Sequence, residues 1–200
     1  MKTFHKFEII DGRRKRAVFE IPTSRGYQYL CVYNDIDSYS VVEIEAELLL
    51  NLWRENINNV QRDIAHGSPK SWVNDRKFKD AEIGFLEGEK NPVPLPRISC
   101  GILNEYEDAW ERHFVFFHKY LGKHIRRVPF VSIDDVTRSI WLMTYGAQRF
   151  PVLCSSDYDH VKLLHLLAGD PDVPPQTVKD IFNKTYTLCQ ARGDLHTRVK

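Results

Sequence analysis

Residues 127–154, RVPFVSIDDVTRSIWLMTYGAQRFPVLC, are the stretch that decides the expected fold. Val128–Ile133 is an apolar run with β-branched residues, and it predicts one buried strand that stops at two aspartates. Apolar residues then recur at helical spacing from Val136, and Gly146 stands where a helix commonly ends in a left-handed residue. Phe150–Cys154 predicts a second strand. The stretch therefore predicts a strand, a short helix and a strand.

Charged residues gather at the start of the predicted helix. Asp134 and Asp135 can cap it, because a carboxylate accepts hydrogen bonds from free first-turn amides and is attracted to the positive end of the helix dipole. Arg138 lies in the same turn, where the dipole mildly disfavours a cation. Its position indicates an anionic partner. That partner is either an aspartate, in a local ion pair, or a phosphate that the free amides also attract.

Two phrases in this stretch, VTRSIWL at Val136–Leu142 and FPVLC at Phe150–Cys154, resemble those of plasmid fertility-inhibition proteins of the Osa and FiwA type. A strand ending in Asp-Gly-x-x-Arg before a helix, followed by a strand with Pro-Val, is the pattern of the ParB/sulfiredoxin-like superfamily. Asp135 replaces the glycine of that pattern, so ParB-type nucleotide binding does not carry over unchanged. Sulfiredoxins place a catalytic cysteine immediately before a His-Arg pair, whereas this chain has Val136-Thr137-Arg138, which argues against sulfiredoxin activity.

This resemblance implies an α+β fold, a small mixed sheet with helices, in which a ParB/sulfiredoxin-like core follows an N-terminal β-rich extension. It further implies a plasmid-encoded factor that blocks DNA or protein transfer through a conjugative type IV secretion system. Nucleotide hydrolysis and DNA cleavage have been linked to that fold, so ATP is a possible substrate. DNA, the secretion coupling protein and the transfer substrate complex are the implied partners.

The residues at the strand end suit such chemistry. Asp134 and Asp135 are predicted to be catalytic and to hold Mg²⁺ or orient water, since hard oxygen donors suit that ion. Arg138 is predicted to clamp a phosphoryl oxygen and stabilise its developing charge. First-turn amides and nearby arginines would extend this surface. The predicted phosphate-binding set is Val136, Thr137, Arg138, Arg127 and Arg149.

Two alternatives stay open. In the first, the aspartates only cap the helix, Arg138 pairs with them, and the chain is a non-enzymatic interaction module that occupies the secretion coupling protein. In the second, the chain binds DNA as ParB does, without cleaving it. The lack of a recognisable helix-turn-helix or a strongly basic domain counts against the second.

Composition excludes several classes. Lys+Arg 28 against Asp+Glu 27 leaves a net charge of +1, so the field of the whole molecule does not steer nucleic acid. No uncharged apolar run is long enough for a transmembrane helix, and the start lacks the features of a signal peptide. These features predict a cytoplasmic protein, and the resemblance implies a peripheral position at the inner membrane through a protein partner. The isolated cysteines, which form no CxxC pair, are expected to be small buried hydrophobes.

The rest of the chain divides into two predicted parts that form one compact unit. Residues 1–66 predict a β-rich segment, a small antiparallel sheet, covered by a helix from Glu45 to His66. Residues 67–200 predict the ParB/sulfiredoxin-like core with C-terminal helices opening near Asp157 and Thr177. The four segments of the sheet are Phe4–Ile10, Ala17–Ile21, Tyr27–Tyr33 and Tyr39–Ile44.

Three further segments carry charge. Lys70–Lys79 interleaves cations with Trp72 and Phe78, which suits a single-stranded nucleic-acid groove or, alternatively, a loop pinned to the core by Trp72. Asn104–Phe117 predicts a helix running into a strand, and Glu105–Asp108 would add Mg²⁺ ligands if they fold against Asp134 and Asp135. The basic tract Arg13–Arg16 is expected at a solvated hairpin tip.

Overall fold

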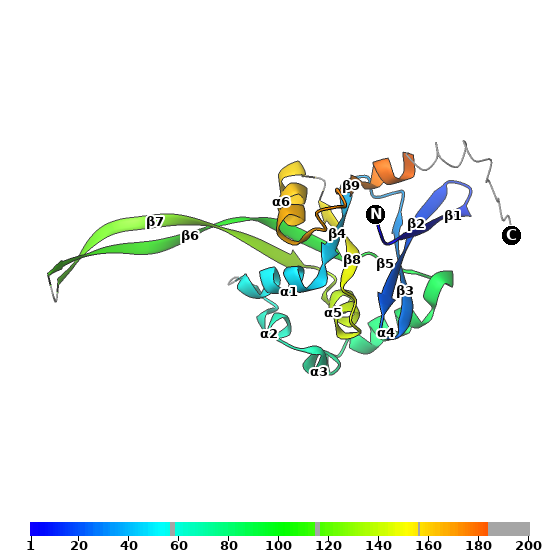
Figure 1. Ribbon diagram of the computed structural model, residues 1–200, viewed down its shortest axis with the longest axis horizontal. Helices are drawn as coiled ribbons and strands as arrows, with labels where there is room; N and C mark the ends of the chain where they lie inside the picture. Colours follow the sequence, from blue (N-terminus) through cyan, green and yellow to red (C-terminus); the bar gives the residue numbers. More distant parts are fainter. Residues whose placement is uncertain (57–58, 115–116, 156, 184–200) are drawn as a thin grey trace.

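The computed structural model describes residues 1–56, 59–114, 117–155 and 157–183. Its strands form a four-stranded and a five-stranded sheet, and helices pack around both, so the α+β fold class is confirmed (Figure 1). The N-terminal sheet has the order β1-β2-β3-β5, with β1 (Phe4–Asp11), β2 (Arg14–Thr23), β3 (Gly26–Tyr33) and β5 (Val93–Pro94). The central sheet has the order β7-β6-β8-β4-β9, with β7 (Phe117–Ile133), β6 (Arg97–Phe114), β8 (Arg149–Ser155), β4 (Tyr39–Glu45) and β9 (Gln176–Thr177).

The helices are mostly short. The two longest are α1 (Ala46–Glu55) and α6 (Tyr158–Ala168), which pack on each other and on the central sheet. The helix α6 opens where it was expected, with Asp157 as its N-cap residue; the predicted capping pattern began at Ser156, which is outside the described residues. Thr177 accepts a hydrogen bond from the Asp180 amide where the next helix opens, and the chain is helical from Val178 to residue 183. The others are α2 (Arg62–Ala65), α3 (Pro69–Trp72), α4 (Phe78–Leu86), α5 (Val136–Thr144) and the 3₁₀ turn η1 (Gly88–Lys90).

The predicted strand, helix and strand are present as the end of β7, α5 and β8. Gly146 ends α5 with φ +77°, the left-handed conformation expected there. Trp141 and Leu142 of α5 are buried, and the Trp141 ring stacks on Phe85 of α4 with 4.2 Å between centroids. However, β6 lies between β7 and β8, so the two strands of the predicted unit are not neighbours.

Three predictions are corrected by the structure. The helix expected from Glu45 to His66 ends at Glu55, and its buried Trp53 lies in a helix that packs on β7, β4 and α6, not on the N-terminal sheet. Asn104–Phe117 begins no helix: residues 104–114 continue β6. The fourth strand of the expected N-terminal sheet, β4, pairs with β8 in the central sheet.

The division at residue 66 stays a prediction. It does not coincide with the division between the sheets, because β4 precedes it and pairs with β8, which follows it. The ParB/sulfiredoxin-like relationship likewise stays a prediction.

Residues 70–79 run from helix α3 to the start of helix α4. Trp72 and Phe78 are buried, and the Trp72 indole donates a hydrogen bond to the Ile64 carbonyl at 2.7 Å. Their rings are therefore core groups that hold this segment in place, as the alternative interpretation expected, and they offer no face to a base.

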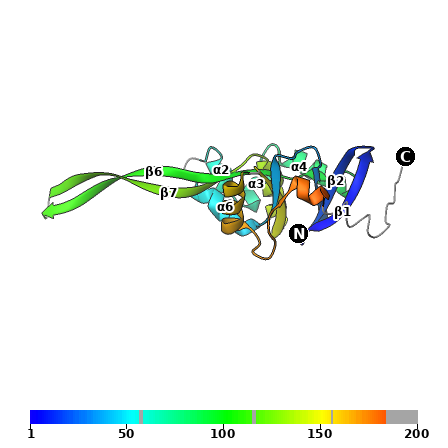
Figure 2. The same cartoon turned by 90° about the horizontal axis from the view of Figure 1, so that it is seen from above.

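A long two-stranded ribbon leaves the body of the molecule. β6 and β7 stay paired from Ile98 and Ile133 to the far end, and the ribbon extends well beyond all other elements in both views (Figures 1 and 2). We call residues 102–114 and 117–129 the arm. Among the described residues, no helix combines the length and apolar character that crossing a membrane requires.

The N-terminus is tied to the central sheet by two buried carboxylates. Glu43, in β4, accepts hydrogen bonds from the amides of Lys2 at 2.9 Å and Thr3 at 3.2 Å. Asp170 accepts from Lys2 Nζ at 2.8 Å and pairs with Arg149 at 3.2 Å. The hydrogen bond from Lys2, with help from the Asp172 amide and Arg149, holds the pKa of Asp170 below its ordinary value against the opposite effect of its burial.

This cluster predicts how stability depends on pH. Because the folded-state pKa of Asp170 is lowered, its stabilisation is complete at neutral pH and is lost as pH falls through that pKa, below about pH 4. Asp170→Asn should lower the free energy of unfolding at pH 7, and the difference from wild type should shrink as the pH is lowered. Asp172→Asn, at an exposed position beside the same lysine, is the matched control and should change little. Urea unfolding at pH 7, 5 and 3 measures both; a difference that grows on acidification would contradict this account.

A second prediction uses two glycines with room for a methyl group. Gly146→Ala should lower the free energy of unfolding by about 1–2 kcal/mol, since its positive φ is strained for alanine although an added Cβ would meet no atom within 4 Å. Gly84→Ala, inside α4, should raise it by about 0.5–1 kcal/mol, because there the Cβ would only touch Val93 at 3.5 Å. Urea titrations in which the m-value is unchanged measure the free energy of unfolding of both variants. Changes of the same sign would contradict the different backbone roles of the two glycines.

Candidate functional site

The backbone of Arg97, the first residue of β6, is hydrogen-bonded both to the end of β7 and to the start of α5. Its carbonyl accepts a hydrogen bond from the Asp134 amide at 3.0 Å, and its amide donates to Asp135 Oδ2 at 3.3 Å. Asp135 is the N-cap residue of α5, yet its side chain makes no capping hydrogen bond. The predicted capping by this carboxylate is therefore wrong, since the group is engaged by Arg97 and by Arg138 instead.

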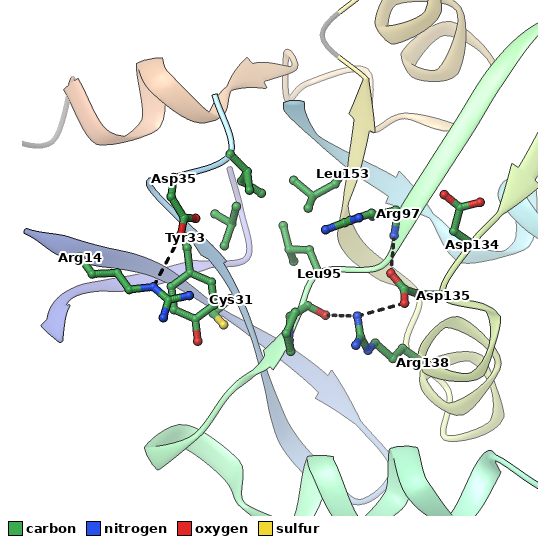
Figure 3. Close-up of a pocket in the computed structure, with 13 residues that line it drawn as sticks. Arg14, Cys31, Tyr33, Asp35, Leu95, Arg97, Asp134, Asp135, Arg138 and Leu153 are labelled. Atoms are coloured by element: carbon green, nitrogen blue, oxygen red, sulfur yellow. Dashed lines mark hydrogen bonds and ion pairs between the residues drawn. The ribbon is translucent and has the colours of Figure 1, made fainter. Parts of the chain in front are cut away.

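Arg138 has the ion pair that the sequence allowed. One guanidinium nitrogen lies 3.3 Å from Asp135 Oδ1 and donates to the Pro94 carbonyl at 3.4 Å (Figure 3). The side chains of Arg138 and Asp135 are 30% and 31% exposed. A pair this open to water contributes less than about 1 kcal/mol, so another anion can replace the carboxylate at small cost.

Two open cavities meet at this arginine. The first, about 610 Å³, lies between β3, β5 and the start of α5, and the second, about 700 Å³, lies between α5, α4 and the segment before α4. Both volumes are within the range of small-molecule sites. Tyr33, Pro94, Asp134, Asp135 and Arg138 line both cavities.

Cations and carboxylates alternate around the two cavities. In the first, Arg14 lies over the Tyr33 ring at 4.2 Å and pairs with Asp35 at 3.7 Å (Figure 3). In the second, Arg76 and Lys77 face the α5 start together with Asp75 and Asp80. The sequence drew attention to the tracts that hold Arg14, Arg76 and Lys77 but did not connect them with Arg138, because only the fold brings them to one place.

The first turn of α5 supplies hydrogen-bond donors to the second cavity. Val136 and Thr137 line it, and within the described residues their amides have no acceptor. The dipole of a nine-residue helix adds positive potential at this end. Three of the predicted phosphate-binding residues, Val136, Thr137 and Arg138, are thus together, with donors suited to an anion.

The other two predicted members are elsewhere. Arg149 is at the opposite end of β8 from Leu153, which lines the first cavity, and it pairs with Glu45 at 3.0 Å and with Asp170. Arg127 lies on the arm, and neither residue lines these cavities. Their predicted part in a common phosphate site is therefore not supported by the fold.

The carboxylates do not form a ready metal site. Asp134 is exposed, both oxygens of Asp135 have partners, and among the described residues no three acidic, His or Cys side chains could hold a metal ion. Glu105–Asp108 lie on the arm, several residues along β6 from the level of Asp134, so they do not fold against it. The Mg²⁺ site therefore remains a prediction.

The described cysteines are buried free thiols, as expected. Burial is the main cause that raises the pKa of Cys100 to about 12 and of Cys154 to about 11. Cys31 reaches the first cavity, but burial raises its pKa as well, so its thiol stays protonated at neutral pH. Cys189 is outside the described residues.

Arg138 should contribute little to the stability of the fold, and this can be tested. Arg138→Ala should lower the free energy of unfolding by less than about 1 kcal/mol, because its ion pair is solvated. Trp141→Ala, one turn further along α5, should lower it by about 3–5 kcal/mol, because it empties a buried site. Chemical denaturation of both variants measures the contrast, and a large loss for Arg138→Ala would give that residue a structural role.

Comparisons with known proteins identify a family and a related fold. A family model described as "Plasmid Fertility inhibition factor" matches residues 41–169, from β4 to the end of α6, and so includes the arm and the start of α5. No curated protein matches the chain. A crystal structure of the Oncogenic Suppression Activity Protein, titled a plasmid fertility inhibition factor and solved as a gold(I) cyanide derivative, is similar with a TM-score of 0.67 and 20% identity. The match covers 92% of this chain and 85% of that one, and at this identity it concerns the fold.

Proposed function

Because the chain belongs to the plasmid fertility inhibition factor family, we propose that it blocks the passage of DNA or protein substrates through a conjugative type IV secretion system. It acts in the cytoplasm, and a protein partner brings it to the inner membrane. The coupling protein, or the transfer substrate complex bound to it, is the expected target.

One observation carries the molecular part of the proposal. Val136, Thr137 and Arg138 line the same cavity at the positive end of α5, and among the described residues the amides of Val136 and Thr137 have no acceptor. Donors of this kind bind the phosphate of a nucleotide or of DNA. Arg76 and Lys77, on the same cavity, supply further positive charge for a ligand with more than one phosphate.

The ion pair gives this site a simple mode of action. On binding, Arg138 exchanges the Asp135 carboxylate for a phosphoryl oxygen, and the exchange costs little because the pair is solvated. Asp135 keeps its hydrogen bond from the Arg97 amide and is free to orient a water molecule beside the phosphorus. Hydrolysis of ATP and cleavage of DNA are the two reactions that this arrangement would serve, with Arg138 stabilising the charge that develops.

A non-enzymatic interaction module is the second candidate. Asp135 and Arg138 satisfy each other, and their remaining contacts are with the backbone at Arg97 and Pro94. On this view they position β5 against α5, and inhibition comes from occupying a surface of the secretion machinery.

The discriminating experiment compares cavity variants with a matched arginine variant. Arg138→Ala and Asp134→Asn/Asp135→Asn should lower ATP hydrolysis and plasmid nicking by about 100-fold or more, since they remove the clamp and the water-orienting groups. Arg13→Ala, an exposed arginine that lines neither cavity, should keep wild-type rates. Phosphate release, plasmid relaxation and mating frequency are measured together, with magnesium or with EDTA.

If wild type and the cavity variants form equal amounts of product, any turnover comes from a contaminant or from another site. If every protein is inert yet still lowers mating, the interaction module is the correct reading. If wild type does not lower mating at all, the proposed role in fertility inhibition is wrong.

A further inference from the structure

The two sides of the arm differ in chemistry. In a two-stranded ribbon, successive pairs of facing residues point alternately to opposite faces. We call one side the aromatic face; it continues the buried pair Cys100–Val131 outward from the body. Its facing pairs are Ile102–Pro129, Asn104–Arg127, Tyr106–Ile125, Asp108–Lys123 and Trp110–Tyr120.

The other side, the charged face, carries the pairs Glu105–Arg126, Glu107–His124 and Glu111–Lys119, together with the small or apolar pairs Leu103–Val128 and Ala109–Gly122. Arg126 pairs with Glu107 across the strands at 3.4 Å, and Glu111 faces Lys119. Charge on this face is therefore largely matched within the arm. The arm is amphipathic although it projects into solvent on both sides (Figures 1 and 2).

Large apolar groups on the aromatic face are open to solvent. Tyr106, Trp110 and Ile125 are 63%, 58% and 60% exposed. On this face the apolar pairs alternate with the polar pairs Asn104–Arg127 and Asp108–Lys123. An isolated two-stranded ribbon is only marginally stable in water, and large apolar side chains exposed together on one face commonly mark an interaction surface. We therefore expect this face to contact another molecule.

The charges on the aromatic face indicate the chemistry of that occupant. Tyr120 packs on Trp110 with ring centroids 5.0 Å apart, and its hydroxyl donates to Asp108 at 3.2 Å. Asp108 is thus already engaged. Lys123 lies opposite Asp108 and Arg127 opposite Asn104, and neither cation forms an ion pair among the residues that the structure describes. The face therefore offers apolar pairs with two cations between them.

We propose that the aromatic face of the arm docks on a protein of the transfer machinery, on an apolar strip bordered by carboxylates that pair with Lys123 and Arg127. This inference rests on the proposed role in fertility inhibition but does not depend on catalysis. Exposed tyrosine and tryptophan provide the contact area, and the cations set orientation and association rate.

Other occupants fit less well. Ile102 and Ile125 cannot stack on bases as aromatic platforms do, and five Lys/Arg against four Asp/Glu along the described part of the arm leave only a small positive charge to attract a polyanion. A second copy would bring two more free cations to the face, against aspartates that are already hydrogen-bonded to tyrosine. A foreign protein surface with its own carboxylates avoids both difficulties.

The test compares two charge reversals on the same strand. Lys123→Glu/Arg127→Glu changes the aromatic face, and Lys119→Glu/Arg126→Glu makes the same change on the charged face. The probe is the purified cytoplasmic domain of the coupling protein from the inhibited plasmid, in biolayer interferometry at low and high salt. The first variant should bind at least about tenfold more weakly and lose inhibition of mating, and the second should stay within about threefold of wild type.

Three results would overturn the proposal: equal loss in both variants, binding of the aromatic face to a labelled single-stranded oligonucleotide instead of the coupling protein, or a wild-type dimer that the first variant converts to monomers. Trp110→Ser/Tyr106→Ser, which changes no charge, must also weaken binding. If wild type binds the probe with this face preference yet does not lower mating, the proposed function fails and the docking surface stands.

Discussion

The parallel pairing of β6 with β8 is the constraint on which the rest of the structure depends. It involves only Arg97 with Leu153 and Ile98 with Cys154, but it fixes where β6 starts. The backbone of Arg97 then holds Asp134 and Asp135, and so fixes the end of β7 and the start of α5. Because β5 precedes Arg97 by two residues, the same pairing brings the Pro94 carbonyl to Arg138.

Local structure was predictable from the sequence because its causes are local. Gly146 and the helical spacing after Val136 located α5, and Trp72 indicated a pinned loop. Pairings between distant segments were not predictable in this way, which is why the insertion of β6 and the transfer of β4 to the central sheet were missed. For residues 104–114 a signal was present: Glu105, Tyr106 and Glu107 alternate with period two, as a strand requires, and the acidic composition was given too much weight.

The candidate site shows the same limit. Asp135, Val136, Thr137 and Arg138 belong to one turn, so their proximity follows from the sequence, and so does the ion pair that was left open there. Arg14 and Arg76 come from segments far away in the chain, and no periodicity connects them with α5. Arg149 lies away from the site for a geometric reason. It is the first residue of β8, and a strand places its first and last residues at opposite ends of the sheet.

The arm has a consequence for how such proteins diversify. Past Ile102 and Pro129 the described strands pair only with each other, so a substitution in the exposed outer part of the ribbon leaves the strand pairings of the body in place. The outer ribbon can therefore change in sequence while the folded base is retained. Such a division separates sequence variation in the arm from selection for stability.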